Sequence, residues 1–317
     1  MQKVTVSAPG KLHLSGEHAV VYGNPAVVVS ISLRTTVTLE AGSDTGTQSA
    51  ALRSSDKFID AILKIFEKQY ATVIPDDLTI TISSSIPVGS GMGSSAALAV
   101  AIIGACMTFF DKPWDTKRIN ELAYQAEKFM HGNPSGGDPA IVTHGGILWY
   151  RKELDFLKTF WLLPFKIPSA FAPYVLINTG RSETTGELIR AVAEMRKKNN
   201  ELFTMKLDAI EQTSKSMVQA IHDEKEADFN HSIKQNEQLL EELGIVSSSA
   251  HALIADVESV GGVAKISGAG GIKTGSGVVI AIHTKPQEMM ALAKKYAYPA
   301  FQVVLGGDGV RKEQVVA

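Results

Sequence analysis

The sequence has very little cysteine and almost no excess of charge. Its 317 residues include one cysteine, Cys106, and carry a formal net charge of −2. A chain with one thiol forms no internal disulfide, which is typical of a reducing, cytoplasmic compartment, and Cys106 lies in an apolar run where a core thiol is expected. The small charge excludes a strong basic field, so we expect neither a nucleic acid nor an anionic membrane as the main partner.

Long apolar runs are also missing. The longest, Ala96–Phe110, is rich in alanine and glycine. It is short for a membrane span and suits a buried helix. The first residues, M-Q-K-V-T-V, pass directly into strand-like alternation without a charged leader and an apolar block, so no signal peptide is expected.

Three common catalytic signatures are absent. The sequence contains no Gly-x4-Gly-Lys-Ser/Thr, no His-Glu-x-x-His and no Gly-x-Ser-x-Gly. These absences argue against a Walker-type nucleotide site, a zinc enzyme and a serine hydrolase.

Hydrophobic periodicity predicts alternating strands and helices in the first half of the chain. The expected strands are Lys3–Ser7, Ala26–Ile31, Thr35–Glu40, Leu78–Ser83 and Gly146–Arg151. The expected helices are Lys57–Tyr70, the buried run Ser94–Phe110, and a helix that Asp115 caps and that presents Ile119, Leu122, Ala123, Ala126 and Met130 on one face. A Gly/Pro-rich loop, His131–Gly137, is expected to end this last helix.

Long charged helices dominate the second half. The expected helices are Thr184–Asn199, Leu202–His222, Glu224–Leu243, Ser247–Val260 and Pro286–Lys294, and the expected strands are Gly262–Ser267, Gly277–His283 and, as the last one, Ala300–Leu305. Helices clustered with a few strands predict an α+β fold. The segment Phe156–Ser169 mixes proline, aromatic and lysine residues, so we expect a domain junction there, with domains at residues 1–165 and 166–317.

The segment Pro87–Ala97, P-V-G-S-G-M-G-S-S-A-A, follows an expected strand and leads into the alanine-rich helix. Its glycines and serines leave backbone N–H groups uncovered, and the helix N-terminus adds partial positive charge, which predicts an anion site, best suited to a nucleotide phosphate. The hydroxyls of Ser94 and Ser95 can cap the helix or bind Mg²⁺. The plain alternative is a tight turn. A dinucleotide fingerprint with Asp111 as its acidic residue is disfavoured, because no strand precedes that acid.

Three further segments combine glycine-rich turns with charged side chains. They are Ala8–Gly23, His131–Ala140 and Lys265–Gly277. Taken alone, Lys11 and Glu17 could form a strand-edge ion pair of little energetic value. Glu127 could be a solvated helix carboxylate, and Asp138 could be a surface turn residue.

Together these segments resemble the GHMP kinase superfamily and, within it, the mevalonate kinases. The resemblance runs from Ser7 to Arg311. G-K-L-H-L-S-G-E-H-A-V-V-Y-G is similar to the first motif of the superfamily, P-V-G-S-G-M-G-S-S-A-A to its phosphate loop, and K-I-S-G-A-G-G to its third motif. E-K-F-M-H-G-N-P-S-G-G-D-P-A and the later G-G-D-G-V-R are similar to mevalonate kinases in particular.

The resemblance implies a two-domain α+β kinase fold with the active site in the cleft between the domains. It implies ATP-dependent phosphorylation of the mevalonate 5-hydroxyl in isoprenoid biosynthesis, by a monomer or a homodimer. The alternatives are another small-molecule kinase of the superfamily, acting on phosphomevalonate, a sugar or homoserine, and the related diphosphomevalonate decarboxylase.

The resemblance also assigns expected roles to individual residues. Asp138 is expected to be the base at the substrate hydroxyl, with Lys11 beside it, while Ser95 and Glu127 hold Mg²⁺ against the phosphates of ATP. The expected ATP contacts are Pro87, Gly89, Ser90, Gly91, Met92, Gly93, Ser94 and Ser95. The expected substrate contacts are Lys11, Glu17, His18, Asp138, Arg181, Thr185, Gly268 and Ala269.

Two segments depart from the pattern of the superfamily. Ile272-Lys273-Thr274 interrupts the third motif before Gly275-Ser276-Gly277, so that Lys273 either adds a phosphate contact or lies on a bulge. Arg181, in the segment Asn178–Gly186, is displaced from the usual basic position. A guanidinium there can still bind a carboxylate through two parallel hydrogen bonds.

Overall fold

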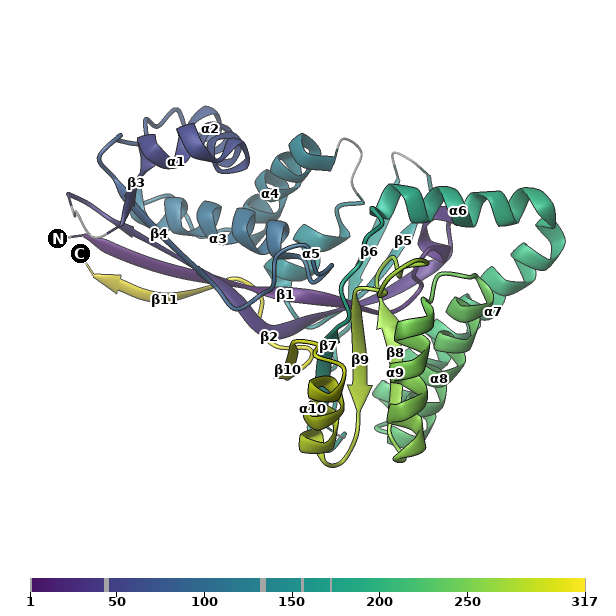
Figure 1. Ribbon diagram of the computed structural model, residues 1–317. Helices are drawn as coiled ribbons and strands as arrows, with labels where there is room; N and C mark the ends of the chain where they lie inside the picture. Colours follow the sequence, from purple (N-terminus) through teal and green to yellow (C-terminus); the bar gives the residue numbers. More distant parts are fainter. Residues whose placement is uncertain (1, 43–45, 132–134, 155–156, 172, 317) are drawn as a thin grey trace.

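Two antiparallel sheets organise the molecule, and helices pack on both of them (Figure 1). The structure is a computed structural model that describes residues 2–42, 46–131, 135–154, 157–171 and 173–316. The larger sheet has the order β11-β1-β2-β4-β3, and β5 and β6 extend it from the other half of β2. The smaller sheet has the order β10-β7-β9-β8.

The strands have the following bounds. The larger sheet contains β1 (Lys3–Ser15), β2 (Pro25–Glu40), β3 (Thr47–Gln48), β4 (Thr79–Ser84), β5 (Ile147–Lys152), β6 (Lys158–Leu162) and β11 (Arg311–Val316). The smaller sheet contains β7 (Tyr174–Asn178), β8 (Val263–Ser267), β9 (Val278–Ile282) and β10 (Ala300–Val303).

The helices fall into two groups. Those over the larger sheet are α1 (Ser49–Ser55), α2 (Lys57–Tyr70), α3 (Ser94–Phe109), α4 (Thr116–His131) and α5 (Gly137–His144). The later ones are α6 (Thr185–Lys198), α7 (Asn200–His222), α8 (Glu226–Glu242), α9 (Ser248–Ser259) and α10 (Pro286–Lys295), of which α8, α9 and α10 contact the smaller sheet. A 3₁₀ helix, η1 (Ala19–Tyr22), follows β1.

The strongly periodic helices lie where the sequence predicts them. Helix α2 has the expected bounds, and Asp115 caps α4, because its Oδ1 accepts hydrogen bonds from the amides of Lys117 and Arg118 at 2.9 and 3.3 Å. The predicted apolar face of α4 is buried at Ile119, Leu122, Ala123 and Ala126. The side chain of Met130 and residues 132–134 of the predicted loop lie outside the described residues.

One correction concerns the second strand of the larger sheet. The sequence predicts separate strands at Ala26–Ile31 and Thr35–Glu40, but β2 runs through both. Arg34 lies in the polar stretch between them, and its guanidinium donates hydrogen bonds to the carbonyl oxygens of Asp308 and Gly309, at 3.0 and 2.7 Å. The strand continues through this stretch because its backbone stays paired with β1, with Arg34 opposite Pro9 and Ile31 opposite Gly10.

A second correction concerns the end of the chain. Ala300–Leu305 is not the last strand, because β11 follows and pairs with β1, with Lys3 opposite Val316. Every residue of β11 is exposed, so its sequence carries no alternation between a buried and a solvent face. The other elements that were not predicted from the sequence are short: η1, α1, α5, β3, β6 and β7.

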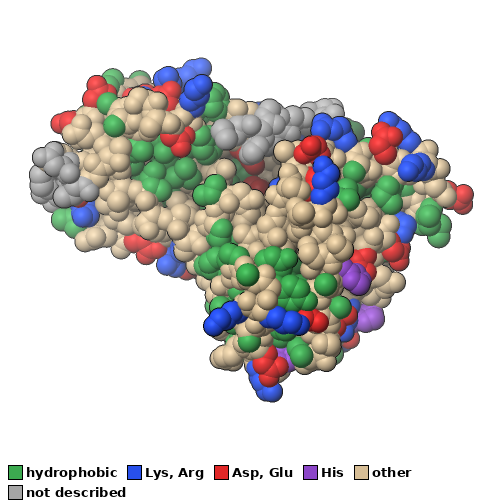
Figure 2. Space-filling model, in the orientation of Figure 1, with side chains coloured by type: hydrophobic (Ala, Val, Ile, Leu, Met, Phe, Trp, Pro, Cys, Tyr) green, Lys and Arg blue, Asp and Glu red, His purple; other side chains and the backbone are tan. Residues whose placement is uncertain are grey.

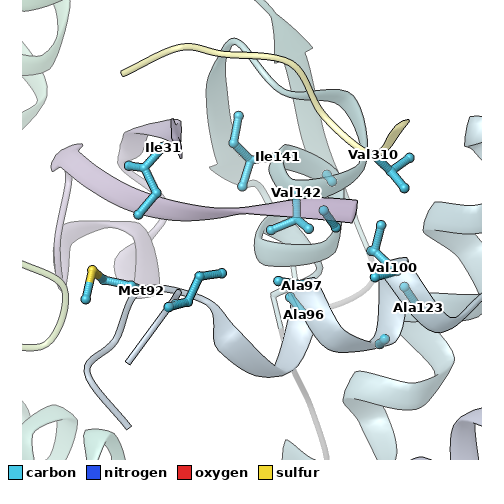
Figure 3. Packing of buried hydrophobic residues seen from close by; sticks show 14 of the residues in the cluster. Ile31, Met92, Ala96, Ala97, Val100, Ala123, Ile141, Val142 and Val310 are labelled. Atoms are coloured by element: carbon cyan, nitrogen blue, oxygen red, sulfur yellow. The ribbon is translucent and has the colours of Figure 1, made fainter. Parts of the chain in front are cut away.

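Helix α3 is the centre of the larger core. Most of its side chains are buried, and it contacts β1 and β2 on one side and α2, α4 and α5 on others. Figure 3 shows the small side chains Ala96 and Ala97 facing Val142 of α5, which allows the two helices to lie close together. Burial raises the pKa of the Cys106 thiol in this helix to about 12, so Cys106 is a core thiol, as expected.

The described residues form an α+β protein, as the sequence predicts. The strand β6 belongs to the larger sheet and β7 to the smaller one. Phe156 of the expected junction lies outside the described residues. The division into domains at residues 1–165 and 166–317 stays a prediction. Among the helices that the structure describes, none is long and apolar enough to span a bilayer. Lys and Arg are interspersed with Asp and Glu over α2, α6 and α7 on the face in Figure 2.

Candidate active site

A cavity of about 790 Å³ lies where β1, the loop before α3, α4 and α5 meet the loops of the smaller sheet. Most of the predicted site residues line it: Lys11, Glu17, His18, Gly89, Gly91, Gly93, Ser94, Ser95, Glu127, Asp138, Arg181, Thr185, Gly268 and Ala269. Three residues of the predicted phosphate loop, Pro87, Ser90 and Met92, are not among the lining residues. Residues far apart in the sequence therefore share one cavity.

The loop before α3 presents an open backbone to this cavity. A Cβ atom built on Gly89 or Gly91 would meet nothing within 4 Å. Behind this face, the Ser90 hydroxyl donates a hydrogen bond to the carbonyl oxygen of Pro87 at 2.7 Å, and the Met92 side chain is fully buried. Among the described residues, no side chain caps the N-terminus of α3. Its first amide groups are therefore free to bind an anion.

Lys11 reaches the cavity because β1 passes very close to this loop. The Lys11 amide donates a hydrogen bond to the Met92 carbonyl oxygen at 2.9 Å. A Cβ atom on Gly10 would lie 2.8 Å from that same oxygen, and one on Gly93 would lie 2.8 Å from Cγ of Lys11. Gly93 also has φ of 76°, in the left-handed region. Both positions therefore require glycine for the strand and the loop to pack in contact.

Asp138 meets Lys11 inside the cavity. Nζ of Lys11 lies 3.1 Å from Oδ2 of Asp138, and the two side chains are 8% and 28% exposed. Asp138 lies in the first turn of α5, after Gly136, whose φ is 81°. The positive end of the helix and the ammonium group both attract negative charge at this carboxylate.

Glu127 of α4 brings a second carboxylate to the same place. Its Oε2 is buried and has no hydrogen-bond partner among the described residues. Burial raises the pKa of Glu127 to about 8, and the nearby charge of Asp138 adds to the shift. The ammonium groups of Lys11 and Lys158 oppose it. An unpaired carboxylate oxygen beside a second carboxylate is suited to a hard cation such as Mg²⁺.

Glu17 has a different partner from the one considered in the sequence. It pairs with Lys265 of β8 rather than with Lys11, and both side chains of this pair are almost fully buried. Glu237 of α8 is close to this pair, and its Oε2 accepts a hydrogen bond from the Ile266 amide at 2.8 Å. Burial raises the pKa of Glu237 to about 8, against the effects of the Ile266 amide and of Lys265. This buried charged cluster joins the first motif to the third.

His18 makes a second connection between the first and third motifs. Its Nε2 lies 2.9 Å from the carbonyl oxygen of Ala269, and its backbone has φ of 57°, which is unusual for a residue with a side chain. Burial lowers the pKa of the His18 imidazole, so the neutral ring is favoured.

The displaced Arg181 lines the cavity from the loop between β7 and α6. Burial lowers the pKa of its guanidinium, and the nearby charge of Glu183 partly opposes this shift. The interrupting residues Ile272-Lys273-Thr274 are exposed and do not line the cavity. Of the two interpretations left open by the sequence, the structure therefore favours a bulge.

Several residues of the cavity wall were not predicted from the sequence. His13, Ser135, Tyr150, Lys152 and Lys158 also line it. His13 was detectable, because it follows Lys11 by two positions on the same strand and so shares its face. Burial, with a smaller effect of Lys11, lowers the pKa of His13 to about 3. Tyr150 and Lys158 lie on β5 and β6, which carry no motif.

The fold and the cavity fit a kinase of the GHMP class, which uses ATP, and comparison with known proteins supports this class. The model of the GHMP kinases N terminal domain matches residues 57–146. The chain is 36% identical to the mevalonate kinase of Archaeoglobus fulgidus over 271 residues, which are 84% of this chain and 88% of the relative. It is 30% identical to the mevalonate kinase of Thermococcus sibiricus, with 99% of each chain covered. The chain belongs to the mevalonate kinase family.

A solved structure supports the same assignment at the level of the fold. The crystal structure of L. major mevalonate kinase in complex with R-mevalonate matches this chain with a TM-score of 0.80 and 22% identity, and the match covers 95% of each chain.

Proposed function

We propose that this protein transfers the γ-phosphoryl group of ATP to the 5-hydroxyl of mevalonate. One observation carries the proposal: Lys11 and Asp138 form an ion pair at 3.1 Å in the same cavity as an open glycine-rich loop and an uncapped helix N-terminus. A phosphoryl transfer to an alcohol needs this combination of a base, a cation and a phosphate-binding backbone. The curated relatives named mevalonate kinase support mevalonate as the alcohol.

In the proposed reaction, Asp138 accepts the proton of the 5-hydroxyl while the hydroxyl oxygen forms a bond to the γ-phosphorus. The bond from that phosphorus to the bridging oxygen breaks, and ADP leaves with the bonding electrons. Lys11 holds the Asp138 carboxylate and offers a positive charge to the oxygen as it loses its proton. Backbone amides of residues 89–95 bind the phosphates, because no side chain in the described part of the chain caps the start of α3.

We assign Mg²⁺ to Glu127 and Ser95. The unpartnered buried oxygen of Glu127 fits a cation, and Ser95 lies in the first turn of α3 in the same cavity. When bound, Mg²⁺ neutralises phosphate charge. The described residues contain no cluster of three or more His, Cys, Asp or Glu side chains that could hold a metal. This suits Mg²⁺, which protein sites bind through one or two carboxylates together with substrate phosphates and water.

We assign the carboxylate of mevalonate to Arg181. Among the described residues, none forms a hydrogen bond or an ion pair with its guanidinium, which lies in the cavity wall. Thr185, His18 and Ala269 complete the proposed substrate side. The single cysteine supports a cytoplasmic location for this enzyme.

The test is a panel of alcohols offered to the purified protein with Mg-ATP. ADP release is measured with mevalonate, phosphomevalonate, galactose and homoserine, CO₂ release is measured with diphosphomevalonate, and ³¹P NMR identifies the product. We expect the highest kcat/KM with mevalonate and a phosphomonoester at its primary alcohol. A higher kcat/KM on another alcohol, or release of CO₂ from diphosphomevalonate, would refute the proposal.

A further inference from the structure

The two loops that bring Arg181 and Ala269 to the cavity are fastened to each other. The loop with Arg181 follows β7, and the loop with Ala269 runs from β8 to the start of β9, where Asn178 lies opposite Val278. The pairing continues beyond the strands: the Thr179 amide donates to the Gly277 carbonyl oxygen and the Gly277 amide donates to the Gly180 carbonyl oxygen, both at 2.8 Å. The loop that leads to α6 therefore starts from a rigid base.

Glu183 makes the connection at the far end of these loops. Its side chain is buried, and its Oε1 accepts hydrogen bonds from the amides of Lys273 and Ile272, at 2.7 and 3.3 Å. Its Oε2 accepts a hydrogen bond from the Ser182 hydroxyl at 3.0 Å. Burial alone would raise the pKa of the Glu183 carboxyl. The hydrogen bonds that it accepts, above all the one from the Lys273 amide, outweigh this effect, so its pKa lies below the usual range. The interrupting residues of the third motif thus supply the donors for a buried carboxylate.

Glu183 lies between two residues that line the cavity, one in its loop and one at the start of α6. Arg181 precedes it by two positions and Thr185 follows it by two. An arginine side chain that has no partner within the protein takes many conformations before it binds a substrate. If its backbone is already fixed, less conformational entropy is lost on binding. A carboxylate anchored to two backbone amides provides such a fixed point, because charge-assisted hydrogen bonds are the strong ones.

We propose that Glu183 is a positioning residue for the acid substrate: it fastens the loop to the bulge at Ile272 and Lys273 and so holds Arg181 against the cavity. This inference rests on the proposed function for the role of Arg181. The connection between the loop and the bulge does not depend on the substrate.

The test compares Glu183→Ala, Glu183→Gln and a matched control, Glu194→Ala, in the full-length protein. Glu194 lies on α6 and is 62% exposed, so its removal leaves the loop untouched. Hydrogen exchange of the segment 270–277 is measured by mass spectrometry, and KM is measured for mevalonate and for ATP. The expected result for Glu183→Ala is about tenfold faster exchange of the Ile272 and Lys273 amides and about a tenfold higher KM for mevalonate. The KM for ATP and kcat change less than about threefold.

Two further results separate positioning from a general loss of structure. Glu183→Gln keeps an oxygen for the two amides and restores most of the exchange protection and of the KM. In an Arg181→Ala background, Glu183→Ala adds less than about a twofold change in KM, because both substitutions remove the same interaction.

The outcomes that overturn the inference differ from those that overturn the proposed function. Unchanged exchange of segment 270–277 in Glu183→Ala would refute the connection, whatever the activity. Faster exchange with an unchanged KM for mevalonate, or additive effects with Arg181→Ala, would refute the positioning role. A parent protein inactive on mevalonate would refute the proposed function and the role of Arg181, and the exchange experiment would still decide whether Glu183 holds the loop.

Discussion

Replacing Asp138 by asparagine removes one negative charge from the cavity and almost no volume. The variant would keep the first turn of α5, where the Ala140 amide donates to the Gly136 carbonyl oxygen at 3.3 Å. The new side-chain amide would not accept a proton from an alcohol. Losing a general base costs about 10²–10⁴-fold in rate, which is roughly 3–5 kcal/mol in the activation barrier. We therefore expect kcat to fall by that factor.

The binding of ATP and the stability of the fold are expected to change little in this variant. The proposed phosphate contacts lie on residues 89–95, on other elements than Asp138. Loss of the ion pair at 3.1 Å leaves the largely buried Lys11 ammonium without its partner, which costs about 1–3 kcal/mol of stability. In a chain of this length that lowers Tm by only a few degrees, so unfolding does not explain a lost activity.

The assay measures ADP release at saturating substrate, with binding of a non-hydrolysable ATP analogue followed by calorimetry. Asp115→Asn is the matched control, because it makes the same chemical change at a helix N-terminus outside the cavity and asparagine also caps helices. A turnover of Asp138→Asn within tenfold of the parent would show that Asp138 is not the base.

Three more substitutions test other parts of the site. Glu127→Gln is expected to raise the Mg²⁺ concentration for half-maximal activity about tenfold or more, and an unchanged Mg²⁺ titration would remove Glu127 from the metal site. Glu237→Gln removes a buried carboxyl whose pKa is raised from 4.5 to about 8. Between these pH values the folded parent binds more protons than the unfolded chain, so the stability of the parent falls as the pH rises through this range. Urea unfolding gives the difference in the free energy of unfolding between variant and parent at pH 5 and at pH 8. This difference should move in favour of the variant by up to a few kcal/mol at the higher pH, and an equal difference at both pH values would contradict the reasoning. Gly93→Ala places a methyl group 2.8 Å from Cγ of Lys11 at a positive φ, so kcat should fall at least tenfold with a lower Tm, and a fully active variant would show that the close approach is not required.

The parts of the fold that could be predicted are those with a strong local pattern. Helix α2 has one apolar face and α3 is apolar all round, so the pattern predicts their bounds to within a residue. Helix α5 could not be predicted, because its eight residues follow a glycine-rich turn and are buried through their contacts with α3, α4 and the larger sheet. The exposed strand β11 has no apolar face, and its pairing with β1 depends on a contact across the whole chain.

The site was predictable only where motifs carry it. Lys11 and Asp138 lie in two of the motifs, and the structure brings them together. The pairing of Glu17 with Lys265 had no local signal, since 248 positions separate the two residues. Lys158 was missed for a related reason. It comes from β6, whose mixture of lysine and exposed aromatic residues is typical of a connecting segment rather than of a cavity wall.

The pairing of β1 with β11 also has a consequence for biosynthesis. The ribosome delivers β1 long before β11, so the outer edge of β1 has no partner until Arg311–Val316 has been synthesised. During that time its unpaired N–H and C=O groups can pair with other nascent chains. A premature stop codon shortly before Arg311 would leave that edge bare permanently, in a chain that otherwise contains every residue proposed for catalysis.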